Sequence, residues 1–415
     1  MSNRGGPFPC LDAYRGIGML LVMTNHVAFA SGIRFRNETI GQFLARTDIA
    51  IPIFFMVSGF LLFRPIVRSM LEQREPTDTR DYFRNRGLRI LPAYWVAMAG
   101  VFIWWGLPQL DNAGPFSAGP IGVIVFYGAM LQTFFASIVF QNYPAFDQAW
   151  SIGTEVTFYL MLPIAAFGLR RWLTGTSPRR MITSLLVFCF ALWCLAQLWR
   201  TGLVVFQPSW AGSAIFWLPG NIDFFGIGMA MAVLSAAHQS GHALPRWIAG
   251  LGRRPWASWL IAGLLWVVVV NPLDLDLFGL FTIHGDPLDF SREYVAKTFM
   301  YGLVSCFFLI PAMFGPQRDG PIRAFLSSRP MVGLGVVSLG FYLWHKAWLL
   351  QAEEWTGAVP FNGSFVRLWA ITFAGGLTCG IISYWVVERP ALGLKRRSSA
   401  VGLPKAAPEA AVQRS

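Results

Sequence analysis

Two side chains that could do chemistry lie eleven residues apart in one apolar segment. The segment reads LDAYRGIGMLLVMTNH, with Arg15 near its start and His26 at its end. In an α-helix, which rises about 1.5 Å per residue, eleven steps separate the two residues by about 16 Å. Such a helix would cross a membrane and carry the imidazole past the midplane, where it could act as a general base. The alternative is a histidine that only forms a hydrogen bond between two helices.

A second group of basic residues lies in RNRGLRILPAYW, which contains Arg86 and Arg89. Guanidinium groups bind phosphate through paired hydrogen bonds, so Arg15, Arg86 and Arg89 could together receive phosphate groups at the cytoplasmic ends of their helices. The alternative is that they only anchor these helices at the lipid headgroups. The sequence has no glycine-rich phosphate loop, which argues against ATP hydrolysis.

Polar residues also occur in three later apolar segments. Glu155 lies in WSIGTEVTFY, about one turn inside its helix, where lipid would not tolerate a carboxylate. It could orient the imidazole of His26, or it could only brace a neighbouring helix. Asp223, near the outer end of the 214–236 segment, could brace a neighbouring helix or belong to the site. His345 closes the segment SLGFYLWH, where a place in the aromatic belt at the membrane surface is the simpler explanation.

The composition of this 415-residue chain is that of an integral membrane protein. Hydrophobic residues make up 55% of the chain and charged residues only 13%, which is too few for a large soluble domain. The net charge of +12 does not indicate a nucleic-acid partner, because the arginines gather between apolar segments, as in the cytoplasmic loops of membrane proteins. The five cysteines show no metal-ligand spacing, and we predict no metal.

Apolar stretches of spanning length predict an all-α integral membrane fold. There are eleven, at 13–31, 49–66, 88–106, 119–140, 150–168, 182–199, 214–236, 256–271, 295–314, 331–350 and 366–387. Several arginine-rich segments between them belong in the cytoplasm by the positive-inside rule. Residues 107–149 contain no lysine or arginine, whereas 170–180 contains four arginines. The first segment lies outside and the second in the cytoplasm if 119–140 is a re-entrant or outer-face segment that does not cross. This leaves about ten transmembrane helices in the plasma (inner) membrane, with both termini in the cytoplasm.

One loop fits the charge rule poorly: the first outer loop, which carries Arg34, Arg36 and Arg46. We expect residues 1–397 to form a single transmembrane domain. Residues 398–415, rich in alanine and proline, are predicted to be a disordered cytoplasmic tail. The first span lacks a cleavage signal and is predicted to be an uncleaved anchor.

The sequence resembles the bacterial membrane acyltransferase family 3, integral-membrane enzymes that O-acylate extracytoplasmic glycans, lipids and some small molecules. The resemblance covers nearly the whole chain and rests on six motifs in the same order. They are LDAYRG with the Arg15–His26 spacing, FFMVSGFLL at 54–62, the pair Arg86 and Arg89, WSIGTEVTFY at 150–159, SLGFYLWH at 338–345 and VERP at 387–390. Each motif alone is weak, but six in order on a chain of spanning helices are specific.

The resemblance implies ten transmembrane helices and an acyl-coenzyme A donor that is reached from the cytoplasm. It also implies that His26 is the essential histidine. Arg15, Arg86, Arg89 and Glu155 match positions in the family's motifs, and the resemblance implies functional roles for them as well.

The chain departs from the family pattern at one position. Many members carry an acidic residue two positions before the paired phenylalanines, where this chain has Pro52. Asp48 lies one helical turn earlier and could substitute, so this role is not carried over. Some members complete the transfer on an appended soluble domain. We expect none here, so the acyl group would pass directly to the acceptor or to a separate protein.

These observations lead to the hypothesis of a membrane O-acyltransferase. The phosphates of an acyl-CoA, with acetyl-CoA as the expected donor, would bind the three arginines, and His26 would deprotonate a hydroxyl of an extracytoplasmic glycan, glycolipid or other acceptor. Asp223, His345 and Trp150 are the candidates for binding this acceptor. An acylated His26 is an open alternative. The alternative class of function is a transporter or flippase for a lipid-linked or acylated molecule, which the lack of internal repeats disfavours.

Overall fold

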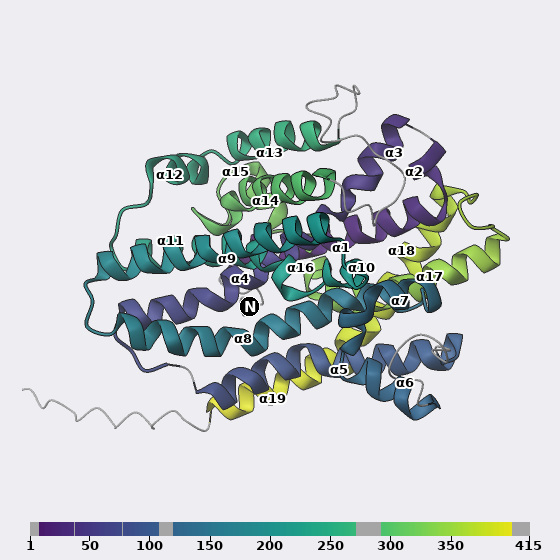
Figure 1. The fold of residues 1–415 in the computed structure, drawn as a ribbon, viewed down its shortest axis with the longest axis horizontal. Helices are drawn as coiled ribbons and strands as arrows, with labels where there is room; N and C mark the ends of the chain where they lie inside the picture. The colour runs from purple at the N-terminus through teal and green to yellow at the C-terminus, as the bar shows by residue number, and fades with distance from the viewer. Residues whose placement is uncertain (1–7, 37, 77, 108–118, 271–291, 401–415) are drawn as a thin grey trace, which may run out of the picture.

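The computed structural model describes residues 8–36, 38–76, 78–107, 119–270 and 292–400, and every regular element in these ranges is a helix. Seven spans within them are long and apolar enough to cross a membrane. They contain α4 (Ala50–Leu71), α5 (Thr79–Trp105), α8 (Trp150–Leu173), α9 (Pro178–Phe206), α11 (Ile222–Gln239), α14 (Arg292–Met313) and α18 (Phe365–Ser383) (Figure 1). The chain is therefore an all-α, multi-pass membrane protein, as predicted.

Further helices bring the described structure to about ten spans. α12 (Arg246–Arg253) and α13 (Pro255–Val270) are bent by 103° relative to each other and add an eighth span if the pair crosses as one. α1 (Pro9–Ala30) and α17 (Ser338–Thr356) have 22 and 19 residues, which suits the thickness of a membrane. Neither belongs to the apolar set. Both carry polar and charged side chains in their interiors, which is where a membrane protein places its functional groups.

The segment near 119–140 forms no spanning helix, which confirms that prediction. It is broken into α6 (Gly119–Gly128), the 3₁₀-helix η2 (Leu131–Phe135) and α7 (Ala136–Asn142). Met130, between the first two, has a left-handed backbone with φ of 60°. The hydroxyl of Tyr94 on α5 donates a hydrogen bond to the carbonyl oxygen of Tyr127 at 2.7 Å, which fastens the broken segment to the bundle.

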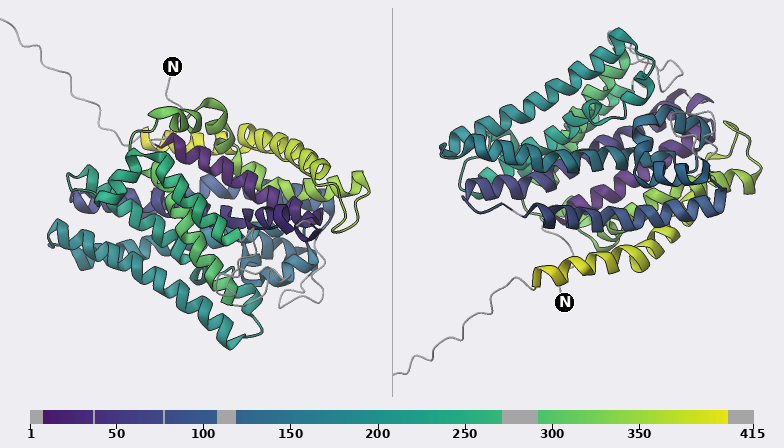
Figure 2. Two further views of the ribbon diagram at one scale, coloured as in Figure 1. Left: turned by 90° about the horizontal axis from the view of Figure 1, so that it is seen from above. Right: turned by 60° about the horizontal axis from the view of Figure 1, so that its bottom comes forward.

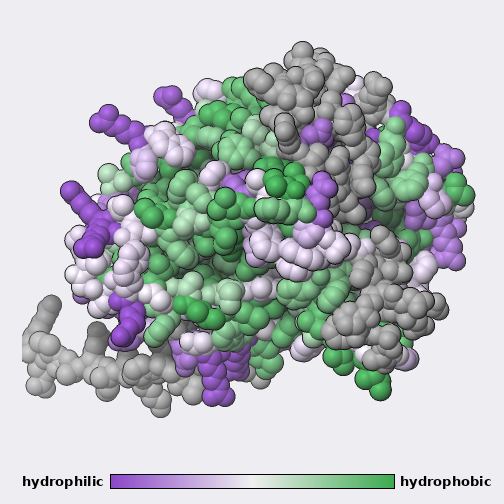
Figure 3. Space-filling model, in the orientation of Figure 1, coloured by the Kyte–Doolittle hydropathy of each residue, from purple (hydrophilic) through white to green (hydrophobic). Residues whose placement is uncertain are grey.

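The long helices lie side by side and give the molecule two ends (Figures 1 and 2). At the first, which we name the arginine-rich end, α4, α8 and α11 finish and α1, α5 and α9 begin. The helix ends and connections there carry seven arginines: Arg68, Arg74, Arg80, Arg170, Arg171, Arg179 and Arg180. At the second, which we name the opposite end, lie α2 (Ile33–Arg36), α3 (Glu38–Ala45) and the broken segment. Figure 3 shows hydrophobic residues across the middle of the molecule, with hydrophilic ones mainly towards the two ends.

Some element boundaries differ from the prediction. α5 begins at Thr79 rather than at residue 88, because Asp78 caps it by accepting a hydrogen bond from the backbone N–H of Arg80 at 2.8 Å. The stretch 331–350 is divided at Val337 into α16 (Arg329–Val336) and α17. After α18, the π-helical turn η5 (Tyr384–Glu388) leads into α19 (Arg389–Ala400). Most of the predicted tail, residues 401–415, lies outside the described residues.

Glycines let two helix pairs pack backbone against backbone. A side-chain carbon added at Gly59 on α4 would lie 2.3 Å from the carbonyl oxygen of Phe225 on α11. One added at Gly228 on α11 would lie 2.0 Å from that of Met56 on α4, so the two helices interlock. α1 and α16 approach each other in the same way at Gly335. Lipid gives helices no hydrophobic reason to associate, so this close packing holds the bundle together.

We expect Gly228→Ala to lower the thermal stability of the purified protein in detergent, because the added methyl group forces α4 and α11 apart. Overpacking of this kind costs about 1–3 kcal/mol. Gly168→Ala on α8 is the matched control, since a carbon added there meets nothing within 4 Å. Equal melting temperatures for the two variants would contradict the interlocking.

Candidate active site

A cavity of about 290 Å³ lies between five of the helices and begins at the arginine-rich end. α1, α4, α5, α8 and α17 supply nearly all of its lining, and α19 adds Leu392. Its polar lining includes Arg15, Ser58, Arg86, Arg89, Glu155 and Tyr342. The structure thus brings together four of the residues singled out in the sequence, from three different helices.

The three arginines of the cavity have no protein partner. Arg86 and Arg89 are three positions apart on α5 and therefore share one face of that helix. Among the described residues, no hydrogen bond or ion pair engages the guanidinium group of Arg15, Arg86 or Arg89, and the Nε of Arg86 is buried without a partner. Two carboxyl groups, Asp12 and Glu155, share the lining, and a third, the buried Glu388, interacts electrostatically with Arg15 and Arg89. Unpartnered guanidinium groups in a cavity suit an oxyanion ligand.

Glu155 is held inside this cavity by two hydroxyl groups. Both Ser58 on α4 and Tyr159 donate hydrogen bonds to its Oε1, the latter at 2.6 Å. Tyr159 lies four positions after Glu155, on the same face of α8. No hydrogen bond joins Glu155 to His26, so the expected pairing of these two residues is not found in the structure. Glu155 belongs to the arginine-lined cavity instead.

His26 is paired with His345. The Nδ1 of His26 lies 2.9 Å from the Nε2 of His345, and the Nδ1 of His345 lies 2.6 Å from the carbonyl oxygen of Tyr342. A carbonyl oxygen can only accept, so the Nδ1 of His345 carries a proton and, in the neutral ring, its Nε2 accepts. The Nδ1 of His26 must then donate to it. This leaves the Nε2 of a neutral His26 with a free lone pair, which is the requirement for a general base.

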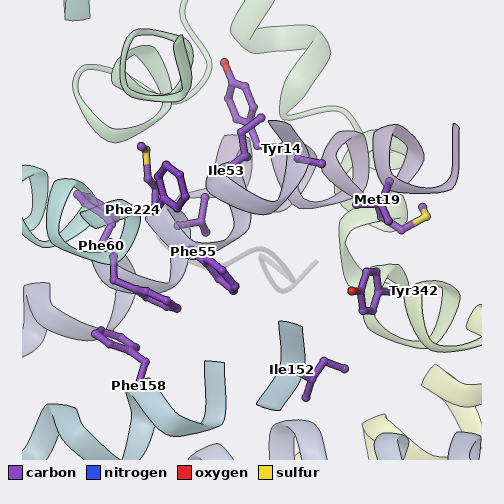
Figure 4. Close-up of a cluster of buried hydrophobic side chains, with 14 of the residues drawn as sticks. Tyr14, Met19, Ile53, Phe55, Phe60, Ile152, Phe158, Phe224 and Tyr342 are labelled. Atoms are coloured by element: carbon purple, nitrogen blue, oxygen red, sulfur yellow. The ribbon is translucent and has the colours of Figure 1, made fainter. Parts of the chain in front are cut away.

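Tyr342 connects the cavity with the histidine pair. Its carbonyl oxygen accepts a hydrogen bond from the Nδ1 of His345. Its hydroxyl donates a hydrogen bond of 2.6 Å to the carbonyl oxygen of Gln148 and lies 2.7 Å from the Oγ of Ser151. Figure 4 shows Tyr342, Phe55 and Ile152 around one space, and all three line the cavity. The inner end of the cavity is therefore separated from the histidines by a single residue.

The three candidates for binding an acceptor have different surroundings. His345 is only 1% exposed, and both ring nitrogens are engaged. Trp150 packs edge-on against Phe216, with ring centroids 4.5 Å apart. Asp223 is buried and forms two hydrogen bonds of 2.7 Å with Arg200 of α9, which supports the interpretation of Asp223 as a brace.

The contacts of several residues could not be predicted from the sequence. Asp48 is bound by Lys297 at 3.2 Å and by the hydroxyl of Tyr301, and not by the histidine pair. Ser58 and Tyr342 lie in two of the motifs, but the sequence does not indicate what they bind, because their partners lie on other helices. Tyr159 could have been found, since a tyrosine four positions after a buried glutamate lies on the same helix face.

Comparison with known proteins places the chain among membrane acyltransferases. The family model of an acyltransferase domain matches residues 8–386. The exopolysaccharide production protein ExoZ of Rhizobium meliloti is 24% identical over 391 residues, which cover 91% of this chain and 98% of that protein. The peptidoglycan O-acetyltransferase OatA of Listeria monocytogenes is 23% identical over 352 residues, which cover 81% of this chain and 48% of that protein.

A third relative is YrhL of Bacillus subtilis, which is provisionally named as a peptidoglycan O-acetyltransferase. It is 24% identical over 393 residues, which cover 92% of this chain and 54% of that protein. The chain therefore spans about half the length of the two relatives named for peptidoglycan. No solved structure matches the chain.

The buried pair of Arg200 and Asp223 predicts a structural effect for Asp223→Ala. The variant leaves the guanidinium of Arg200 without its counter-ion, and breaking a buried pair in this way costs about 3–5 kcal/mol. We expect a large fall in melting temperature, measured by thermal unfolding in detergent. A stable Asp223→Ala protein with a raised KM for an acceptor would instead support the binding role.

Proposed function

Because the chain belongs to the acyltransferase 3 family, we propose that it transfers an acetyl group from cytoplasmic acetyl-CoA to a hydroxyl of a glycan or glycolipid outside the cytoplasm. The names of the relatives support this choice, since OatA is a peptidoglycan O-acetyltransferase and ExoZ takes part in exopolysaccharide production. One observation carries the proposal. A single helix, α1, places Arg15 in the arginine-lined cavity. The same helix carries His26, whose Nε2 has a free lone pair, about 16 Å further along.

The charge distribution supports the orientation. The connections at the arginine-rich end carry most of the positive charge, and the positive-inside rule assigns such connections to the cytoplasm. Both termini then lie in the cytoplasm, and His26 lies in the outer half of the membrane. A cytoplasmic donor and an extracytoplasmic acceptor would meet inside the bundle.

The donor would bind in the arginine-lined cavity. Its phosphate groups would supply the oxyanion partners that Arg15, Arg86 and Arg89 lack, and its thioester arm would extend past Phe54 and Tyr342 towards the histidines. We assign Glu155 to this end of the site. Its hydrogen bonds with Ser58 and Tyr159 keep its carboxylate beside the arginines. The negative charge of this carboxylate offsets part of their positive charge when no donor is bound.

The reaction needs one base, and we assign it to the Nε2 of His26. The acceptor hydroxyl gives its proton to this atom as its oxygen attacks the thioester carbonyl. The bond between the carbonyl carbon and sulfur then breaks, and the departing thiolate takes the proton from the imidazolium. His345 is a positioning residue, because it accepts the Nδ1 proton of His26 and so fixes the tautomer and the direction of the ring.

We expect His26→Gln to remain folded and to lose at least about 100-fold in kcat, because an amide can still donate to His345 but cannot accept the proton of the acceptor. The measurement is transfer of labelled acetyl from acetyl-CoA to envelope glycans by the purified protein in liposomes. His238→Gln is the matched control, since His238 is exposed at the end of α11. Near-normal turnover by a folded His26→Gln protein would defeat the assignment of the base.

We expect Arg86→Ala and Arg89→Ala to raise the KM for acetyl-CoA by roughly ten- to a hundred-fold. A charge-assisted hydrogen bond to phosphate typically contributes about 1.5–3 kcal/mol. Arg80→Ala is the control on the same helix, because Arg80 is exposed and does not line the cavity. Unchanged donor KM values for both cavity variants would reduce these arginines to topology anchors.

A further inference from the structure

The first outer loop, which does not fit the positive-inside rule, carries Arg34, Arg36 and Arg46. One of these arginines has a structural role. Arg36, at the end of α2, donates hydrogen bonds to the side chain of Asn362 at 2.9 Å and to the carbonyl oxygen of Gly363 at 3.3 Å. It thereby ties α2 to the connection between α17 and α18. This contact accounts for Arg36 but not for Arg34 or Arg46.

Arg46 is buried and Arg34 is half-buried, and among the described residues neither has a hydrogen-bonding or ionic partner for its guanidinium group. In each, the Nε is hidden from solvent and has no hydrogen-bond partner. Arg46 begins the short 3₁₀-helix η1 (Arg46–Ile49) and exposes only 9% of its surface. A cation buried in a membrane protein normally has a counter-ion, so these two guanidinium groups suit an anionic ligand.

The neighbouring acid, Asp48, is already in use. One of its oxygens lies 3.2 Å from the ammonium of Lys297, and the other accepts a hydrogen bond from Tyr301. The charges of Arg34, Arg46 and Lys297 all act on this single carboxylate. We name Arg34, Arg46, Lys297 and Asp48 the outer basic cluster. Counted over the described residues, it holds three positive charges and one negative charge.

The segment that carries Arg46 is hydrogen-bonded to the turn of α1 that carries His26. Asn25 precedes His26 on α1, and its side-chain amide donates hydrogen bonds to the carbonyl oxygens of Leu44 and Ala45, at 3.3 and 2.9 Å. Ala45 directly precedes Arg46. The turn of α1 that carries the proposed base is thus fastened to the element that carries the unpartnered arginine.

We propose that Arg34, Arg46 and Lys297 form a phosphate-binding site that holds a phosphate group of the acceptor while His26 deprotonates one of its hydroxyls. The excess of two positive charges matches a phosphate, and guanidinium groups bind its oxygens in pairs. The site selects an acidic acceptor, such as a sugar phosphate or a glycolipid with a phosphate link. Its role in acceptor binding rests on the proposed transferase function. The anion site itself does not.

The first test measures binding and needs no activity. It uses the full-length protein in a neutral detergent, with Arg86→Ala and Arg89→Ala in every sample so that the donor cavity cannot hold phosphate. Inorganic phosphate, added at constant ionic strength, should raise the melting temperature with a saturating dependence, because a ligand that binds only the folded state stabilises it. Arg46→Gln should weaken the apparent affinity at least about ten-fold.

Controls separate this site from general effects of charge. Arg367→Gln removes an exposed arginine near the start of α18 at the same end of the molecule, and it should keep the phosphate response. Arg34→Gln serves as an independent variant if Arg46→Gln fails to fold. Equal stabilisation by phosphate of the parent protein and of the folded variants would overturn the proposal.

The second test identifies the source of the phosphate. Glucose 1-phosphate should stabilise the protein in an Arg46-dependent way, whereas methyl glucoside, the neutral analogue, should not. Short-chain phosphatidylglycerol is added in a parallel arm. Stabilisation by this lipid and not by glucose 1-phosphate would overturn the assignment to the acceptor and give the site to a bilayer lipid. If transfer fails but phosphate binding depends on Arg46, the anion site stands and the proposed function falls.

Discussion

The carbonyl oxygen of Tyr342 determines the arrangement of protons at the histidine pair. Because this atom can only accept, it fixes the proton of His345 on Nδ1, and that proton in turn fixes the tautomer of His26. A pair of imidazoles without such an anchor could exchange donor and acceptor roles, and the free lone pair would then point to the partner as often as to a substrate. The position of Tyr342 is fixed by its hydroxyl, which is bound to Gln148 and Ser151 at the start of α8. The chemistry of α1 thus depends on how α8 and α17 pack.

This packing has to be rigid, because the bundle contains polar groups that lipid cannot satisfy. An unpaired polar group in an apolar environment costs several kcal/mol, so each hydrogen bond of the site also resists displacement of its helix. The interlocked glycines of α4 and α11 keep Ser58 in reach of Glu155 on α8. The cavity is consequently preorganised, and its unpartnered arginines are already arranged on helices that do not have to move to receive an anion.

How far the sequence predicts the site follows from which partners share a helix. The faces of Arg86 and Arg89, and the depths of Arg15 and Glu155, follow from helical periodicity and the lengths of the spans. The partner of His26 lies 319 residues away, and nothing in one sequence indicates which helices meet. The sequence does not decide whether Asp223 braces a neighbouring helix or binds the acceptor. Its buried ion pair with Arg200 supports the first role. The number of spans was predicted closely, whereas breaks such as Val337 depend on tertiary contacts.

The departure at Pro52 has a consequence for the charge of the site. Asp48, the acid nearest to that position, is bound by Lys297 and Tyr301 and forms no hydrogen bond with either histidine. The partner of His26 is a neutral imidazole, not a carboxylate. A neutral pair is cheaper to bury than an ionised one, but it offers no counter-charge when His26 takes up a proton. In the proposed mechanism, that positive charge is balanced by the negative charge that develops on the attacked thioester. Base and thioester therefore have to be adjacent at the moment of proton transfer, which couples deprotonation of the acceptor to the presence of the donor.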